Sequence, residues 1–235
     1  KSDLDSFGIK LTKRADQGDT PYNLRNCAFL EEFYKEKIIY QEIVQQPSFA
    51  FDKNGEFFCL DTARIITGEK LLFLLTVLNS ILFFYSVKNF YGGGGLGNTG
   101  IRMKHTFIDK FPVPEIENTQ PFETLAEYLI YLNAPKQAPV LEKVSNEAVS
   151  QVIEDLVNMM VYELYFEEEM KAKEIDVLQF VTEKAFPDIT KSEDPKGTIQ
   201  KVYYELQQKD NPIRNRILVA SSRSETIARI NAATS

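Results

Sequence analysis

An apolar stretch over 71–85 constrains the fold more than any other part of the sequence. A membrane-crossing helix needs about 20 consecutive apolar residues, whereas this stretch is shorter and contains Thr76, Asn79 and Ser80. A helix that is apolar on most of its faces must be surrounded by other protein segments. We therefore predict a buried helix over 70–90, packed against a sheet, and we expect no membrane partner.

Segments rich in β-branched and aromatic residues precede this helix. The patterns over 37–43 and 48–52 predict two strands. Asn54 and Gly55 form a dipeptide that favours a tight hairpin turn, and the segment 57–67 can supply the returning strand. The sequence thus predicts a small antiparallel sheet under the buried helix.

The pattern changes near residue 115. Pro112 and Pro114 favour an extended linker there, because proline disfavours both helix and central strand. Beyond the linker, apolar residues recur with the helical period, and the predicted helices span 122–132, 145–166, 175–186, 196–208 and 213–232. We therefore expect an α+β protein, with a sheet-containing domain over 1–116 and an all-helical module over 117–235.

Local signals support the helical module. Asn211 before Pro212 resembles an N-cap followed by proline at the first helical position. Met159 and Met160 share an apolar stripe with Leu156, which indicates core packing rather than a cofactor site. The acidic cluster in the same helix is interpreted as a solvated face; it comprises Glu163, Glu167, Glu168 and Glu169.

The charge of the chain is unevenly distributed. The formal net charge is -7, but residues 1–114 carry 14 Lys and Arg against 13 Asp and Glu, whereas residues 115–235 carry 13 against 21. Affinity for nucleic acid comes largely from the neutralisation of phosphates, so an acidic chain does not coat DNA without specificity. Any DNA contact is therefore expected to be local and to lie in the first half.

Cysteine and histidine are too few for several classes of site. Cys27 and Cys59 cannot form a disulfide scaffold, and this usage favours a reducing, cytoplasmic location. Two cysteines and His105 cannot build a closed zinc site by themselves. Because the chain starts without methionine or a signal-type segment, we expect a fragment of a longer protein.

The glycine-rich loop 92–100 satisfies the spacing G-x-G-x-x-G twice. A dinucleotide-binding fingerprint needs a strand before the glycines and a helix after them, whereas here a helix precedes them and a basic segment follows. A surface loop is the simplest interpretation. The alternative is a loop that approaches a DNA backbone closely, with Arg102 and Lys104 beside it.

Two further patterns could indicate catalysis. Asp188 after a proline, followed by Asp194-Pro195-Lys196, mimics the metal-binding pattern of some nucleases, but the segment is short, contains a proline and is attributed to coincidence. His105 has no nucleophile motif near it and is interpreted as a donor to phosphate or base. We therefore predict no catalytic residue, cofactor site or metal site in this chain.

Several segments, taken in order, resemble one family. They span 20–27, 37–43, 49–52, 74–84 and 100–114. They are similar to the TaqI-like C-terminal specificity domain, the target recognition domain of type IIG restriction-modification enzymes and related adenine-specific DNA methyltransferases. The resemblance covers about residues 18–116 and is most specific in the helix LLTVLNSILFFY and in the segment that begins at Arg102 and ends in FPVP.

The resemblance implies sequence-specific binding of double-stranded DNA. The parent chain would carry a methyltransferase domain that uses S-adenosylmethionine, and Mg²⁺ if the parent also cleaves DNA. The methylated base must leave the stack, so a second domain has to hold the duplex and read base edges. Polar side chains in the loops are the candidate DNA contacts; they are Asn23, Arg25, Gln41, Asn98, Thr99, Arg102, Lys104 and His105.

Simpler roles stay open for some of these residues, and other functions stay open for the chain. Asn23 and Arg25 could cap a turn before a helix at 28–36, and Gln41 could be an ordinary polar residue on an edge strand. The main alternative function is a helical protein-interaction scaffold within a restriction-modification assembly. A catalytic nuclease fragment is a third reading, and it lacks a metal-binding constellation.

Overall fold

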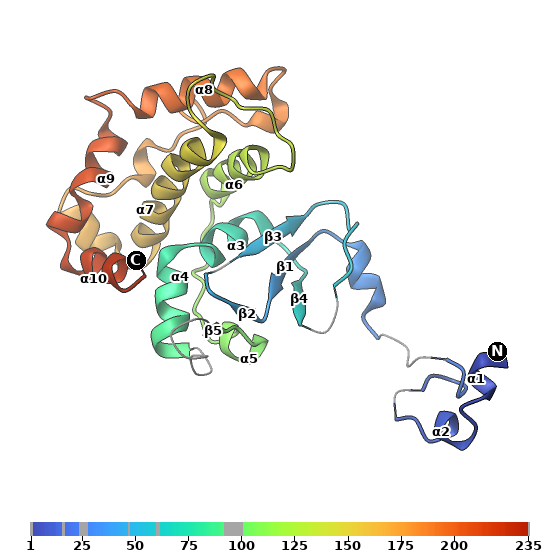
Figure 1. Ribbon diagram of the computed structural model, residues 1–235. Helices are drawn as coiled ribbons and strands as arrows, with labels where there is room; N and C mark the ends of the chain where they lie inside the picture. The colour runs from blue at the N-terminus through green and yellow to red at the C-terminus, as the bar shows by residue number, and fades with distance from the viewer. Residues whose placement is uncertain are drawn as a thin grey trace.

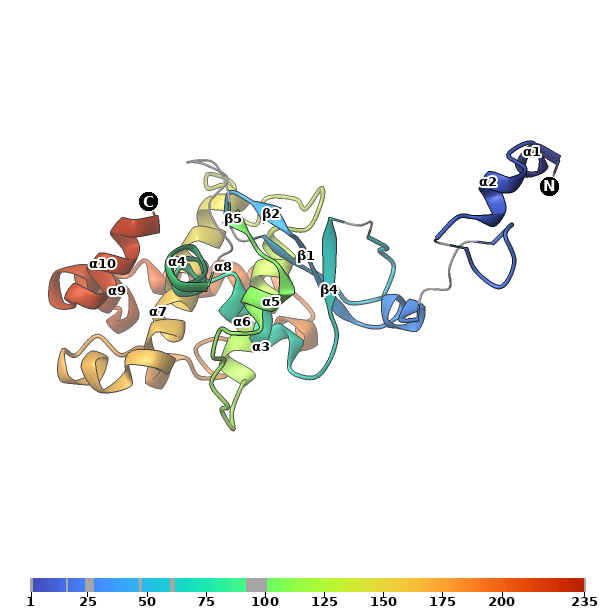
Figure 2. The same cartoon turned by 90° about the horizontal axis from the view of Figure 1, so that it is seen from below.

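The computed structural model describes residues 2–15, 17–23, 28–46, 48–59, 62–91 and 101–234. A sheet with its covering helices forms the centre, and a layer of helices from the second half of the chain packs beside it (Figure 1). The first segment carries two short helices, α1 (Ser2–Asp5) and α2 (Ile9–Thr12), and it lies apart from the other elements in Figures 1 and 2.

A three-stranded antiparallel sheet has the order β3-β1-β4. Its strands are β1 (Lys37–Gln41), β3 (Phe49–Asp52) and β4 (Ala63–Ile66), and a second two-stranded sheet pairs β2 (Ile43–Val44) with β5 (Ile101–Arg102). The predicted α+β class is confirmed. The predicted hairpin between 48–52 and 57–67 is wrong, because β4 pairs with β1 and not with β3.

The turn at Asn54-Gly55 forms, but it does not join paired strands. Gly55 has φ +68°, and a Cβ there would lie 2.3 Å from the carbonyl oxygen of Tyr34, so only glycine fits. The Asp52 carboxylate then accepts the backbone N–H groups of Glu56 and Phe57 at 3.1 and 2.9 Å. These bonds turn the chain away from β3. The N–H groups of Glu56 and Phe57 are thereby occupied and cannot pair with a neighbouring strand.

Asn79 and Ser80 divide the predicted buried helix into two. Helix α3 (Leu71–Leu78) ends at Asn79, and α4 (Ile81–Ser86) starts after Ser80, whose hydroxyl accepts the N–H of Phe83 at 3.1 Å. A π-helical turn, η2 (Val87–Tyr91), continues α4. Among the described residues no single helix is long and apolar enough to cross a membrane, although the pair Leu71–Leu78 and Ile81–Tyr91, bent by 59°, passes the same test jointly.

The Asn79 side chain also fixes the edge of the sheet. Its amide accepts the N–H of Phe49 and donates to the carbonyl of the same residue, both at 3.0 Å, and it donates to the Leu75 carbonyl at 3.1 Å. The break in the buried helix therefore has a structural cause, because the residue that ends α3 pairs with the outer edge of β3.

Helix α3 lies between the sheet and the first helix of the second half, α6 (Gln120–Leu132) (Figure 1). Phe73 meets Phe122 edge to face at 5.2 Å between ring centres, and Phe83 meets Phe49 in the same way at 5.5 Å. One hydrophobic cluster therefore runs without interruption from β1 to the last helix, on both sides of residue 116.

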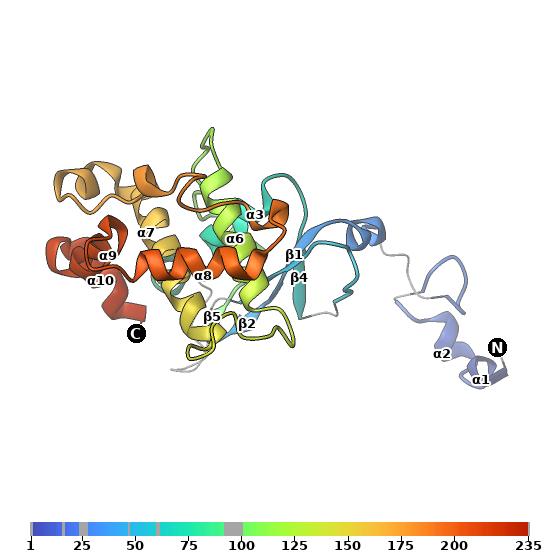
Figure 3. The same cartoon turned by 90° about the horizontal axis from the view of Figure 1, so that it is seen from above.

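The second half is helical, as predicted (Figure 3). Its remaining helices are α7 (Asn146–Ala172), α8 (Pro195–Leu206), α9 (Pro212–Arg223) and α10 (Glu225–Thr234), with 3-10 turns η4 (Leu178–Phe180) and η5 (Ile189–Lys191). Ser145 caps α7 and Asn211 caps α9, both through side-chain oxygens. The predicted helix over 213–232 is two helices, because Ser224 ends α9 and caps α10.

The predicted helix over 175–186 is wrong. Ile175, Val177, Val181 and Phe186 are all buried there, but their spacing does not fit one helical face. Instead the chain is irregular, with η4 as its short helical turn among these residues. The apolar residues that suggested a helix are therefore buried by an irregular segment that packs against the core.

Two of the four glutamates assigned to a solvated face have structural partners instead. Glu163 is 5% exposed and accepts the N–H groups of Val177 and Leu178 at 2.6 and 2.8 Å. Glu169 accepts the hydroxyls of Ser224 and Thr226 at 2.7 and 2.9 Å. The prediction that Leu156, Met159 and Met160 belong to the core is confirmed, since all three are buried.

Candidate nucleic-acid interface

A short ribbon, β2–β5, brings together two segments that are about sixty residues apart in the sequence. Ile43 lies opposite Arg102 and Val44 lies opposite Ile101. The Met103 N–H donates to the carbonyl of Glu42 at 2.6 Å, which extends the pairing to the bend after β1. The ribbon therefore places the end of β1 next to Arg102 and the residues that follow it.

The carboxylate of Glu42 holds two arginines at this place. Arg64, on β4, approaches with Nη2 at 2.9 Å, and Arg102 approaches with Nε at 3.6 Å. The first contact is a hydrogen bond, whereas the second is too long to be one. The Glu42 side chain is 13% exposed, but those of Arg64 and Arg102 are 37% and 42% exposed, so both arginines stay partly accessible to a ligand.

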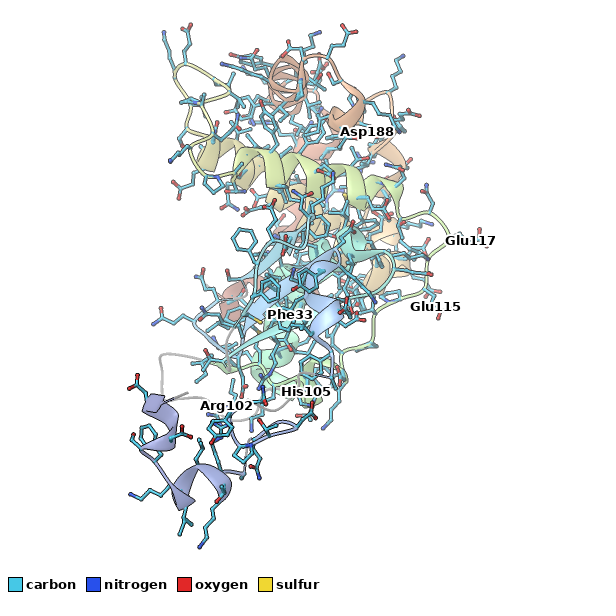
Figure 4. The ribbon with its side chains drawn as sticks, turned by 90° about the vertical axis from the view of Figure 1, so that its right-hand side faces the viewer. Phe33, Arg102, His105, Glu115, Glu117 and Asp188 are labelled. Atoms are coloured by element: carbon cyan, nitrogen blue, oxygen red, sulfur yellow. The ribbon has the colours of Figure 1, made fainter. Side chains whose placement is uncertain are left out.

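Lys104 and His105 follow Arg102 at the start of the short helix α5 (His105–Ile108). The carbonyl of Lys104 accepts the N–H of Ile108 at 3.2 Å, and His105 lies on the exposed side of the turn. We call the group formed by Gln41, Glu42, Arg64, Arg102, Lys104 and His105 the basic face. Figure 4 shows Arg102 and His105 at the same end of the molecule, with Asp188 at the opposite end.

The charges of the basic face act on the hydroxyl of the buried Tyr40. Burial raises the pKa of its hydroxyl to about 12, while the positive charge of Arg64 opposes this shift and the carboxylates of Asp109 and Glu42 add to it. Asp109 therefore acts on the same region as Glu42. Within the basic face Arg64, Arg102 and Lys104 carry positive charge and Glu42 carries negative charge, which leaves a small positive excess.

The sequence-predicted candidates are distributed unevenly. Gln41, Arg102, Lys104 and His105 belong to the basic face, with Gln41 exposed at the end of β1 opposite Ala63. Asn23 lies in the separate first segment (Figure 1), and its backbone N–H donates to Thr20 at 3.0 Å while its carbonyl accepts from Gly18 at 2.9 Å. Asn23 thus lies in a turn, which was the alternative to a DNA contact for this residue. Arg25, Asn98 and Thr99 lie outside the described residues, as does the glycine loop 92–100.

Sequence reasoning missed Arg64 and Glu42. Both belong to segments predicted as strands, and the alternation of side chains along those strands could have placed them on a common side only if the β1–β4 pairing had been known. The wrong hairpin assigned the returning strand to β3. The pairing error therefore hid Arg64, and the β2–β5 pairing that brings Glu42 to Arg102 was not predicted.

The acidic residues of the nuclease-like pattern have structural roles. Asp188 caps η5 by accepting the N–H of Thr190 at 2.9 Å and pairs with Lys191 at 2.9 Å. Asp194 caps α8 by accepting the N–H of Gly197 at 2.9 Å. In the described part of the chain, no group of three or more His, Cys, Asp or Glu side chains could hold a metal ion.

Two comparisons were made with known protein families and curated proteins. A scan against protein-family models and a search of curated proteins both found no match. Any function therefore has to be argued from the sequence and the geometry of the site.

Proposed function

We propose that the basic face binds double-stranded DNA and reads its sequence. The observation that carries the proposal is the shared contact of Arg64 and Arg102 with Glu42, next to the exposed Gln41. An arginine that is already held by a carboxylate loses less conformational freedom when it binds a ligand. The exposed parts of both guanidinium groups can then donate to guanine or to phosphate.

In this proposal the β2–β5 ribbon enters the major groove of DNA. A two-stranded ribbon is narrow enough to enter that groove, where each base pair has a distinct pattern of donors and acceptors. Arg102 pairs with guanine in this proposal, and Gln41 is of a residue type that pairs with adenine. Lys104 and His105, which follow Arg102 in the sequence, contact the DNA backbone in this proposal.

A role as a specificity domain also agrees with the charge of the chain. The net charge of -7 disfavours non-specific coating of DNA, while the small positive excess of the basic face allows local contact. The resemblance of residues 18–116 to target recognition domains of type IIG-like enzymes supports the same reading. In this proposal the methyltransferase domain, S-adenosylmethionine and Mg²⁺ belong to other parts of a longer protein, and the helical half packs on the recognition domain.

Fluorescence anisotropy of a labelled random-sequence duplex tests the proposal with the full chain. Arg102→Ala combined with Lys104→Ala should weaken binding by about tenfold and make it less dependent on salt. The matched control, Lys201→Ala with Lys209→Ala, removes two exposed charges from the region of α8 and should bind like the unchanged protein.

Equal weakening by both double variants would contradict a localised interface. If the unchanged chain retained no duplex but formed a stable complex with a helical partner, the scaffold alternative would be favoured instead.

A further inference from the structure

A groove of about 900 Å³ lies beside the outer edge of β3, away from the basic face. Its walls come from β3, from the break between α3 and α4, from α6 with the residues after it, from α7 and from α10. We call it the β3 groove. Its volume is within the range of cavities that hold small organic ligands.

Glu154 is the only charged residue among the described residues that line the β3 groove. Its carboxylate is half-buried on α7, and among the described residues neither a hydrogen-bond donor nor a cation acts on it. Burial raises the pKa of this carboxyl, and the neighbouring Asp155 adds to the effect. A half-buried carboxylate without a partner is costly, and a cationic group would relieve that cost.

Part of the groove wall is suited to an apolar body. Phe49, Phe51, Phe57 and Phe84 present aromatic surface, and Phe57 is 62% exposed. An organic cation that carries an aromatic or branched hydrocarbon group could bury that group here while its charge reaches Glu154.

The strand edge argues against a peptide as the occupant. A peptide that extends the sheet needs the free N–H and carbonyl of the edge strand. At Phe49 both groups are bonded to the side chain of Asn79. A small molecule does not need these backbone groups, so the bonds from Asn79 do not hinder its binding.

From this geometry we propose that the β3 groove binds a small organic cation, an amine or guanidinium on an apolar body, with Glu154 as the counter-ion. The side-chain amide of Gln151 donates to Asp155 at 2.9 Å, which leaves its oxygen as a second acceptor for the cationic group. The site is independent of DNA binding, because a single carboxylate among neutral walls repels phosphate.

Ligand-observed NMR titration of the full chain with 2-phenylethylamine and with 2-phenylethanol tests the inference. The two probes have nearly the same shape, and the amine alone is charged at neutral pH. The amine should bind about tenfold more tightly than the alcohol, since a charge-assisted hydrogen bond is stronger than a neutral one. Glu154→Gln should reduce the affinity for the amine to that for the alcohol.

Glu168→Gln is the matched control, because it removes an exposed carboxylate of the same helix that does not line the groove. It should keep the preference for the amine. Thermal melting checks that Glu154→Gln is folded, and its melting temperature should be equal to or above that of the unchanged chain. Equal binding of the two probes, failure of both to bind, or unchanged amine binding by Glu154→Gln would each overturn the inference.

Discussion

Lys37 and Asp52 face each other across the β1–β3 pair and form an ion pair that is almost closed to solvent. The side chains are 0% and 3% exposed. The Lys37 ammonium group also donates to the carbonyl of Phe33 at 2.7 Å, while Asp52 accepts the two N–H groups of the turn that follows β3. The pair therefore connects β1, β3 and the turn at Gly55.

Removing the cation of this pair should destabilise the protein strongly. Lys37→Met leaves a buried carboxylate without its counter-ion, which costs about 3 kcal/mol or more in free energy of unfolding. Urea denaturation followed by circular dichroism measures the change. Lys35→Met is the control, because Lys35 is 59% exposed and its ion pair with Glu32 lies at the surface. A loss below about 1 kcal/mol for Lys37→Met would contradict the role given to the pair.

Glu163 should be worth more to stability than its neighbours in the acidic cluster. Glu163→Ala leaves the N–H groups of Val177 and Leu178 without their acceptor, at a cost of about 2 kcal/mol. Glu167→Ala removes a side chain that is 62% exposed and should change the free energy of unfolding by about 0.5 kcal/mol or less. Chemical denaturation measures the free energy of unfolding of both variants. Equal losses of stability would mean that Glu163 belongs to a solvated face after all.

Glu169 should make the junction of α9 and α10 sensitive to acid. Hydrogen bonds from Lys173, from Ser224 and from Thr226 lower the pKa of this carboxyl to about 2. Because the pKa in the folded state is lower than in the unfolded state, the charged carboxylate stabilises the fold above about pH 4, and this contribution is lost as the pH falls towards 2.

Melting temperatures of the unchanged chain and of Glu169→Gln, recorded from pH 7 to pH 2, measure this effect. The unchanged chain should be the more stable of the two at pH 7, and the difference should shrink steadily below about pH 4. A difference that does not depend on pH would show that the carboxylate charge is unimportant.

Glu42 should limit the attraction of the basic face for DNA of arbitrary sequence. Glu42→Gln keeps a side-chain oxygen that can hold Arg64 but removes the negative charge beside Arg64 and Arg102, so the affinity for a random duplex at low salt should rise by about threefold. Glu36→Gln changes the net charge equally at an exposed position outside the face and should have little effect. Anisotropy titrations compare them, and unchanged or weaker binding by Glu42→Gln would contradict this charge balance.

Features with a local cause could be predicted from the sequence. The cap at Ser145, the cap at Asn211 before Pro212, and the buried stripe of Leu156 and Met160 all depend on residues within one or two turns. The bend between α3 and α4 had a local sign too, since Asn79 and Ser80 are the polar residues that divide the helix.

Features that depend on long-range pairing could not be predicted. The dipeptide Asn54-Gly55 favours a hairpin, but the bonds from the turn to Asp52 and the pairing of β4 with β1 prevailed. Glu163 looked like a surface residue, because its partners are fourteen and fifteen residues further along the chain. For the same reason Arg64 was missed at the basic face, where only the sheet register brings it to Glu42.

Hydrogen–deuterium exchange of the full chain, with and without a duplex selected for binding from a random-sequence pool, tests the central claim most directly. Binding at the basic face should slow exchange over 41–44 and 101–108, because these two segments form the ribbon and the turn that would enter the groove. Exchange in α8 and α9 should stay unchanged. Duplex-induced protection confined to the helices after residue 117, or none anywhere, would contradict the assignment of this face to DNA.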